Sequence, residues 1–309
     1  FLTLPKGDTT QRGRGRGLLG GSNDGSPFSN SIQFITIQSQ GNSIDFGDLT
    51  LARSRASSYA SSTRGVWAGG NPATDRIDFV TIATTGNATD FGNLTVARFF
   101  CSGTSSATRG LSVGGNTSPT VVNVIDFTTI ASAGDAQDFG DLLVKKAGLG
   151  ALSSTVRAVF AGGDASTGNL FTIQSIEFAT LGTPTSFGQL TDDRTGHAAV
   201  SSETRGVFAG GKAPGVVNTM EYITIATEGN GTDFGDLSVA KRNMAGNSNS
   251  IRGTFSGGHT AASGSGSNIN VIEYITIAST GDAADFGDLT ETRRCQNAGG
   301  SDAHGGLVR

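Results

Sequence analysis

The residues of this chain that could do chemistry recur at regular intervals instead of forming one cluster. An Asp-Phe-Gly tripeptide, once degenerate as Ser-Phe-Gly, returns every 45 to 52 residues, and a basic residue follows each Phe by seven positions. The six Phe residues are Phe46, Phe91, Phe139, Phe187, Phe234 and Phe286, and the basic residues are Arg53, Arg98, Lys146, Arg194, Lys241 and Arg293. The acid before the Phe and the basic residue after it suggest a repeated ion pair, or a charge hydrogen-bonded to strand carbonyls. Because an active site is normally one asymmetric cluster, six equivalent copies indicate a scaffold.

Other kinds of catalytic or metal chemistry are also disfavoured. Asp-Phe-Gly is the magnesium-binding signature of protein kinases, but this chain lacks their glycine-rich phosphate loop and their catalytic loop. His197, His259 and His304 fall at different positions of the repeat, without the spacing of metal ligands. The acids that could act as catalytic pairs share one repeated strand position instead. They are Asp78, Asp126, Glu177, Glu221 and Glu273. We therefore expect no catalytic residue, no metal site and no cofactor, and hence no enzyme.

These residues must be positioned by a unit of four short strands. The unit opens with an Arg-Gly turn and an apolar strand that ends in Gly-Gly, as in Arg64 to Gly70. A β-branched and aromatic strand such as Ile77 to Ile82 follows, then a Gly-Asn or Gly-Asp turn and the Asp-Phe-Gly strand. A stretch of small residues such as Ser54 to Ser62 closes the unit and suits an innermost strand beside a narrow channel. Repeats of this length are typical of propellers and solenoids.

Spacing within the unit is nearly constant. The Arg of each turn lies 18 residues after the preceding Asp-Phe-Gly Phe in five units, and the sixth such position is His304. The aromatic residue lies 11 residues before the Asp-Phe-Gly Asp in five units, but only eight separate Phe178 from Ser186 in the fourth. Nearly all remaining length variation lies between Gly-Gly and the aromatic strand. Only this connection is free to vary.

The two ends of the chain fall within one unit, since the chain starts near a Gly-Gly strand and ends after a small-residue strand. We therefore predict an all-β, six-bladed β-propeller with four-stranded blades, closed by the C-terminal strand. In this closure the segment near Gln296 to Ala303 pairs beside Gly17 to Gly20. The six Asp-Phe-Gly Phe residues are expected to be buried between neighbouring blades. Cys101 and Cys295 are interpreted as small buried apolar side chains and not as a disulfide.

Composition and charge exclude some classes of partner. The 309 residues carry 22 Lys and Arg against 26 Asp and Glu, and the basic residues are spread through the repeats. A nucleic acid backbone requires a concentrated basic surface, so nucleic acid is not an expected partner. No apolar run reaches the roughly 18 to 20 residues of a membrane helix, so no membrane insertion is expected. Because the first residue is Phe1, we expect a processed product or part of a longer chain.

The order of elements resembles the kelch repeat. A Gly-Gly doublet is followed by an aromatic residue beside an acid (Asp78-Phe79, Glu221-Tyr222), then by an aromatic residue before Leu, then by a basic residue. The resemblance covers residues 14–309, with Phe in place of the usual outer-strand Trp, and leaves 1–13 as a lead-in segment. It implies a β-propeller of kelch-like blades around a central channel.

Two stretches also resemble proteins of tailed phages. Leu4 to Arg12 is similar to segments that precede domains in phage fibre proteins, and the repeats Arg-Gly-Val-Phe-x-Gly-Gly and Asp-Phe-Gly-Asp-Leu resemble kelch-like virion proteins of marine phages that infect cyanobacteria. These resemblances imply a non-enzymatic structural or adhesion module of a virion, extracellular, in a homo- or hetero-oligomeric assembly. Its partners would be other virion proteins or a host surface glycan. The alternatives are a secreted or cell-surface bacterial kelch scaffold and a saccharide-active propeller enzyme.

The variable connections are the expected binding loops. Equivalent loops of a propeller emerge on one face, and loops that differ on a constant scaffold often carry binding, although neutral drift would also produce such variation. The two longest run from Asp164 to Gln174 and from His259 to Asn270. The candidate partner-binding residues are Asp164, Asn169, Phe171, Gln174, His259, Ser263, Asn268 and Asn270. The competing surface is the opposite face, where the Arg-Gly turns would present a ring of positive charge.

Overall fold

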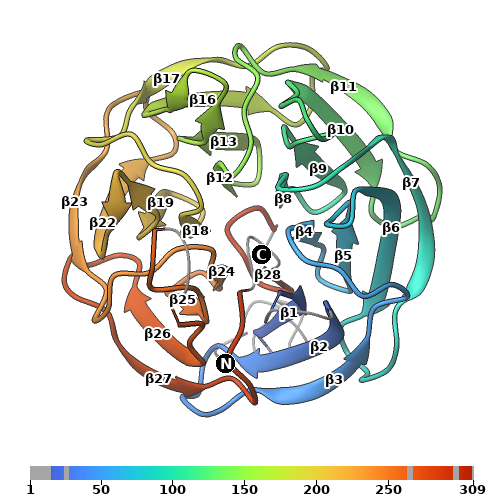
Figure 1. Ribbon diagram of the computed structural model, residues 1–309, viewed down its shortest axis with the longest axis horizontal. Helices are drawn as coiled ribbons and strands as arrows, with labels where there is room; N and C mark the ends of the chain where they lie inside the picture. The colour runs from blue at the N-terminus through green and yellow to red at the C-terminus, as the bar shows by residue number, and fades with distance from the viewer. Residues whose placement is uncertain (1–14, 24–27, 263–266, 295–298, 308–309) are drawn as a thin grey trace, which may run out of the picture.

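The chain folds into a ring of blades around a central axis. The computed structural model describes residues 15–23, 28–262, 267–294 and 299–307. Within these ranges, six four-stranded antiparallel sheets surround the axis, as Figure 1 shows. The protein is therefore an all-β, six-bladed β-propeller, and this fold prediction is confirmed. The proposed lead-in segment, residues 1–13, lies outside the described residues.

Each blade runs from an innermost strand at the channel to an outermost strand at the rim. Blade 1 contains β28 (Gly299–Ser301), β1 (Arg16–Ser22), β2 (Ser29–Thr36) and β3 (Ile44–Asp48). Blade 2 contains β4 (Ser57–Ala60), β5 (Arg64–Ala68), β6 (Thr74–Thr81) and β7 (Thr89–Arg98). Blade 3 contains β8 (Ser102–Ser105), β9 (Arg109–Val113), β10 (Val124–Thr129) and β11 (Gln137–Asp141).

The second half of the ring repeats this arrangement. Blade 4 contains β12 (Gly150–Ser153), β13 (Arg157–Ala161), β16 (Thr172–Glu177) and β17 (Thr185–Gln189). Blade 5 contains β18 (Ala198–Ser201), β19 (Arg205–Ala209), β22 (Thr219–Thr224) and β23 (Thr232–Asp236). Blade 6 contains β24 (Ala245–Ser248), β25 (Arg252–Ser256), β26 (Val271–Thr276) and β27 (Ala284–Asp288). Two small hairpins are β14 (Asp164–Ala165) with β15 (Gly168–Asn169), and β20 (Lys212–Ala213) with β21 (Gly215–Val216).

Blade 1 closes the ring, because its innermost strand comes from the other end of the chain. β28 pairs antiparallel with β1 over three residue pairs. The Asp302 carboxylate accepts a hydrogen bond from Arg16 N at 2.8 Å, as the Ser61 hydroxyl does from Arg64 N at 3.1 Å in blade 2. In blade 1 hydrogen bonds thus join the two innermost strands, whereas in the other blades a turn of the chain connects them. The predicted closure by the C-terminal strand is confirmed.

The Asp-Phe-Gly tripeptide is explained by contacts between neighbouring blades. Gly47 has φ +146°, and a β-carbon there would lie 2.4 Å from the carbonyl oxygen of Gly86 in the next blade. Gly86 N also donates a hydrogen bond to the Phe46 carbonyl at 2.8 Å. Only glycine fits where these two backbones touch.

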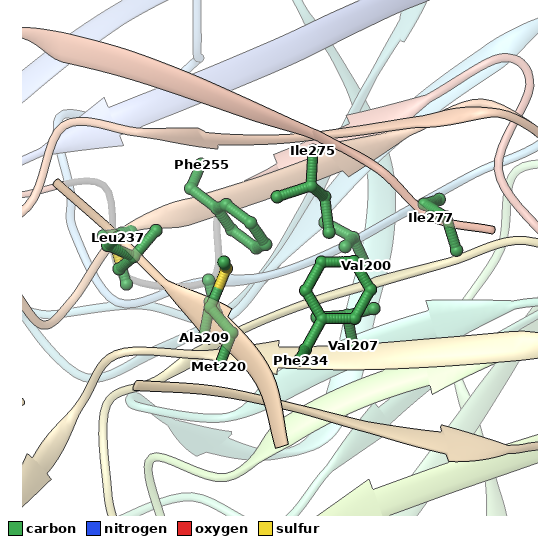
Figure 2. Packing of buried hydrophobic residues seen from close by; sticks show 11 residues of the cluster. Val200, Val207, Ala209, Met220, Phe234, Leu237, Phe255, Ile275 and Ile277 are labelled. Carbon is green, nitrogen blue, oxygen red and sulfur yellow. The ribbon is translucent and has the colours of Figure 1, made fainter. Parts of the chain in front are cut away.

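The six Phe residues of this motif are buried between blades, as predicted. Each is only 2 to 3% exposed and lies in an apolar cluster. In the cluster between blades 5 and 6, Phe234 of β23 lies with Val207 of its own blade and with Ile275 of β26. Figure 2 shows the Phe234 ring among these side chains and Val200. The recurrence of Phe therefore reflects blade-to-blade packing.

We expect the Phe234→Ala substitution to lower the free energy of unfolding by about 3 to 5 kcal/mol, because it leaves a cavity between two blades. Equilibrium denaturation measures this loss. The matched control is Phe171→Ala in a loop, where the ring is 42% exposed and its loss should change stability little. A loss below about 1 kcal/mol at Phe234 would show that the recurrent Phe has another purpose.

The basic residue of each unit is also fully buried, and at four junctions it forms an ion pair with the next blade. The four pairs are Arg53–Asp78, Arg98–Asp126, Arg194–Glu221 and Lys241–Glu273. In blade 3 the Arg98–Asp126 distance is 2.8 Å, and Arg98 also donates to the Ser112 carbonyl at 3.0 Å. Of the two predicted arrangements, hydrogen bonds from the charge to strand carbonyls are confirmed for Arg53 and Arg98, whereas the acid predicted for the ion pair was wrong. The Asp-Phe-Gly acids that form part of that prediction, such as Asp90, are exposed at the rim.

In the fourth repeat, the residues at the acid and aromatic positions of the third strand differ from those predicted. β13 pairs with β16 so that Phe160 lies opposite Gln174, which therefore occupies the acid position. The assignment of Glu177 to that position is wrong, and Glu177 is exposed. Ser175 occupies the aromatic position, and it precedes Ser186 by the usual 11 residues. The apparent shortening of this repeat came from reading the Ile-Glu-Phe sequence as the equivalent strand.

Two junctions therefore lack an acid on the following blade. Gln33 takes the acid position in blade 1, where Arg293 pairs instead with Glu291 at 2.8 Å. Lys146, at the junction where Gln174 replaces the acid, is fully buried, and its ammonium has no hydrogen-bond partner in the described part of the chain. Burial lowers the pKa of Lys146 to about 8. A buried cation without a counter-charge destabilises the fold.

We expect Lys146→Met to leave stability unchanged or to raise it at pH 7, because the substitution removes an unpaired buried charge. Lys241→Met, at the equivalent position, should lower it by about 3 to 5 kcal/mol, because Glu273 is left buried without its cation. Denaturant unfolding of the two variants makes the comparison. An equal decrease in the free energy of unfolding in both variants would contradict the conclusion that Lys146 lacks the ion pair that Lys241 forms.

The pH dependence of Lys146 gives a second measurement. Its pKa is about 8 in the fold and 10.5 in an unperturbed lysine, so between these values the unfolded chain binds more protons. Stability should therefore rise from pH 8 to pH 10.5 in the wild type, and Lys146→Met should remove that part of the rise.

Candidate functional site

The propeller presents two different faces. The Gly-Gly to aromatic-strand loops and the connections between blades lie on the same face, because a β-bridge joins Ser54 of a connection to Asn71 of a loop, and equivalent bridges follow at the next four junctions. We call this the loop face. The opposite face carries the Arg-Gly turns, and we call it the turn face.

The arginines of the turn face are committed to the scaffold. Arg64 Nη1 donates to the Ile130 carbonyl of the next blade at 2.9 Å, and its guanidinium lies 4.6 Å from the centre of the Phe79 ring. The arginines that make the same carbonyl contact are Arg16, Arg109, Arg157, Arg205 and Arg252. The assignment of His304 to the sixth position is wrong, because Arg16 of the closing blade makes this contact.

The long loop of blade 4 forms a small hairpin on the loop face. Asp164 of β14 is exposed, and Asn169 of β15 donates from its Nδ2 to the Lys212 carbonyl of the next blade at 3.2 Å. Phe171 is 42% exposed. Gln174 is buried in β16 and accepts a hydrogen bond from Leu143 N, so it is not part of the exposed loop.

The long loop of blade 6 is anchored by His259 and Asn268. His259 is fully buried, and its Nδ1 lies 3.0 Å from Asn268 Oδ1. Asn268 also donates from its Nδ2 to the carbonyl of Asn23 in the blade 1 loop at 3.3 Å. Asn270 is half-buried, and its carbonyl accepts from Leu289 N at 2.7 Å. Ser263 lies outside the described residues.

Three half-buried arginines that were not predicted as site residues gather near this loop. Arg294 Nε donates to Asn268 Oδ1 at 2.9 Å, and Arg242 Nε donates to the Ala261 carbonyl at 2.9 Å. Arg55 lies over the Phe100 ring at 5.3 Å. Burial lowers the pKa of Arg55, and the positive charges of Arg294 and Arg242 lower it further. In the sequence, Arg242 and Arg294 directly follow a repeated cation and Arg55 comes two residues after one, but Lys145 beside Lys146 shares this pattern without being one of the three.

The central channel is narrow because its walls are made of small residues. Serines at the ends of five innermost strands each donate a hydrogen bond to a carbonyl of the preceding blade, as from Ser105 Oγ to Ala60 at 2.7 Å. The other four are Ser153, Ser201, Ser248 and Ser301. The cavity inside has a volume of about 50 Å³, enough for a few water molecules.

Residues 302–307 fill the turn-face end of this channel, where Figure 1 shows the red C-terminal segment at the centre of the ring. A β-carbon on Gly306 would lie 1.8 Å from the Ser105 carbonyl oxygen. Gly306 N donates to His304 Nδ1 at 3.0 Å, so Nδ1 carries no proton and Nε2–H donates to the Ala60 carbonyl at 2.9 Å. The segment is therefore held by a neutral histidine. Burial lowers the pKa of His304 below the usual 6.5.

We expect stability to fall as the pH drops below 6.5, because protonation at Nδ1 opposes the Gly306 N–H and the unfolded chain binds the proton more readily. For one histidine the loss between pH 7 and pH 5 is at most about 2 kcal/mol. Thermal unfolding of wild type and His304→Gln at both pH values measures the part due to His304. His197, whose pKa burial lowers to about 3, contributes equally to both proteins. An unchanged pH dependence in His304→Gln would contradict this role.

The described residues were also searched for a metal site, a membrane span and a reactive cysteine. In the ranges that the structure describes, no group of three or more His, Cys, Asp or Glu side chains is arranged to hold a metal ion. No helix within those ranges has the length and hydropathy of a membrane span. Cys101 is buried, which raises the pKa of its thiol, and Cys295 lies outside the described residues.

Comparisons with known proteins do not identify a family. No family model matches this chain, and no curated protein matches it. The propeller fold therefore stands on the structure, whereas the kelch and phage resemblances can support only a proposal.

Proposed function

We propose that this protein is a kelch-like, non-enzymatic module of a tailed-phage virion, which binds another virion protein or a host surface glycan through its loop face. The resemblance of its repeats and of Leu4 to Arg12 to phage proteins supports the virion assignment. Localisation in the particle, outside the host cell, follows from the same proposal.

The observation that carries the proposal is how completely the repeated residues are used by the scaffold. The Phe residues fill the blade junctions, most of the buried cations pair with the next blade, and the turn-face arginines bind strand carbonyls. What differs between blades is the loop face, where the hairpin of blade 4 and the loop of blade 6 stand on equivalent strands. Differing loops on a constant scaffold are a common place for recognition.

We expect exchange of the two long loops to weaken binding without harming the fold. Residues 164–172 and 259–271 would each be replaced by the short Asn71–Arg76 loop, since Ile173 and Ile272 align with Ile77. Insertions in surface loops change stability little, so the melting temperature should stay close to that of the wild type. Incorporation into purified particles and adsorption to the host are the measurements.

The control replaces residues 116–124 of blade 3 in the same way. It should leave incorporation and adsorption unchanged. Equal effects of the control and the double exchange would reject the long loops as the binding surface. Absence of the wild-type protein from purified particles, by mass spectrometry, would reject the virion assignment and favour a bacterial scaffold.

A further inference from the structure

We propose that Arg55, Arg242 and Arg294 form a binding site for one oxyanion group, a carboxylate, sulfate or phosphate, at the loop-face mouth of the channel. This inference rests on the proposed function and names the chemistry of its ligand. Such a group is present on acidic surface saccharides and on small free anions.

Backbone hydrogen bonds join five of the connections around the mouth, from the one after blade 1 to the one after blade 5. Phe100 N donates to the Arg55 carbonyl at 2.8 Å, and Gly148 N donates to the Phe100 carbonyl at 2.9 Å. Gly196 and Asn243 continue this chain of hydrogen bonds through the connections of the following blades. Side chains on these connections are therefore presented from fixed positions around the axis, which is the preorganisation that a binding site needs.

The three arginines break the symmetry of this ring. They stand on three consecutive connections, from blade 5 to 6, from 6 to 1 and from 1 to 2. The equivalent residues on the other three connections are uncharged: Phe99, Phe100, Ala147, Gly148, Thr195 and Gly196. One asymmetric cluster on a symmetric scaffold is the arrangement expected of a functional site.

The positive charge of this cluster is not neutralised. None of the carboxylates that the structure describes forms an ion pair with Arg55, Arg242 or Arg294. The guanidinium of Arg55 has no hydrogen-bond partner among the described residues, and its Nε is buried. Cations brought together without an acid repel one another, and a bound anion would relieve that repulsion.

Neighbouring groups hold the arginines in place for such a ligand. Asn268 Oδ1 accepts from Arg294 Nε at 2.9 Å, and Arg294 Nη2 lies 2.7 Å from His259 Nε2. The rings of Phe99 and Phe100 lie 6.0 and 5.3 Å from the Arg55 guanidinium. A planar guanidinium that is fixed in this way can donate two parallel hydrogen bonds to a carboxylate, sulfate or phosphate.

The rest of the surface favours a single acidic group over a long polyanion. The formal net charge is −4, and the six buried repeated cations are nearly balanced by buried acids such as Asp78 and Glu273, so the exposed surface is also acidic. Aspartates of the Asp-Phe-Gly motif, such as Asp45 and Asp233, are exposed around the rim. A polyanion would be repelled there, whereas one oxyanion at the mouth meets only the arginines.

The test compares two triple variants that lose the same charge. The first is Arg55→Gln with Arg242→Gln and Arg294→Gln. The control, Arg76→Gln with Lys145→Gln and Lys212→Gln, removes three positive charges from other surface positions. Calorimetric titration with sodium sulfate and with phosphate, at constant ionic strength in chloride, measures the affinity. Monomeric galacturonate and neutral galactose are the saccharide probes.

We expect saturable sulfate or phosphate binding to wild type and control, weakened at least about tenfold in the mouth variant. Thermal unfolding without added anion checks that the mouth variant folds, since it loses the hydrogen bonds of Arg242 and Arg294 as well as the repulsion between the three charges. Equal anion affinity in the mouth variant, or no saturable binding to the wild type, would overturn the site.

The saccharide probes separate this site from the proposed function. Binding of galacturonate but not galactose, lost in the mouth variant, identifies an acidic saccharide as the source of the anion. Binding of sulfate alone supports the site and assigns it to a free anion. Host adsorption that depends on the long loops but not on the three arginines would leave the proposed function standing and remove this site from it.

Discussion

A cation that is fully buried must have an opposite charge or hydrogen-bond acceptors nearby, and in this propeller four of the six repeated cations find an acid on the next blade. The contact runs in one direction, from the connection of one blade to the third strand of the following blade. A directional contact of this kind generates a ring when the last blade meets the first. Phe packing, the glycine contact at the rim and the turn-face arginines follow the same direction, so each junction repeats one design.

That repetition explains why the conspicuous motif of the sequence says little about function. Asp-Phe-Gly is a packing motif here, in which Phe fills the junction and Gly admits the backbone of the next blade. The features that differ between blades carry more information. They are the loops of blades 4 and 6, the arginines at the mouth of the channel, and Lys146, which has no partner among the residues that the structure describes.

The fold could be predicted from the sequence because its determinants are periodic. The number of blades, the closing strand and the burial of the six Phe residues all follow from regular spacing. The acid partners could not be predicted, because the pairing of Arg98 with Asp126 crosses 28 residues between blades and leaves no trace within one repeat. The register of the fourth repeat was misread because Ile176 to Phe178 has the Ile-acid-aromatic sequence of the other repeats. The acid and aromatic positions of the strand are in fact occupied by Gln174 and Ser175. The mouth arginines were missed because only the fold shows that the connections carrying them are consecutive around the channel.

The C-terminal segment in the channel also affects how water and ions can move along the axis. Residues 302–307 press against carbonyls of β8 and of the turn after β18, with His304 against β4. These residues therefore occupy the turn-face end of the channel. The loop-face end is where the three arginines lie, so the residues that we propose to bind an anion would also meet any water or ion that enters the channel from that side.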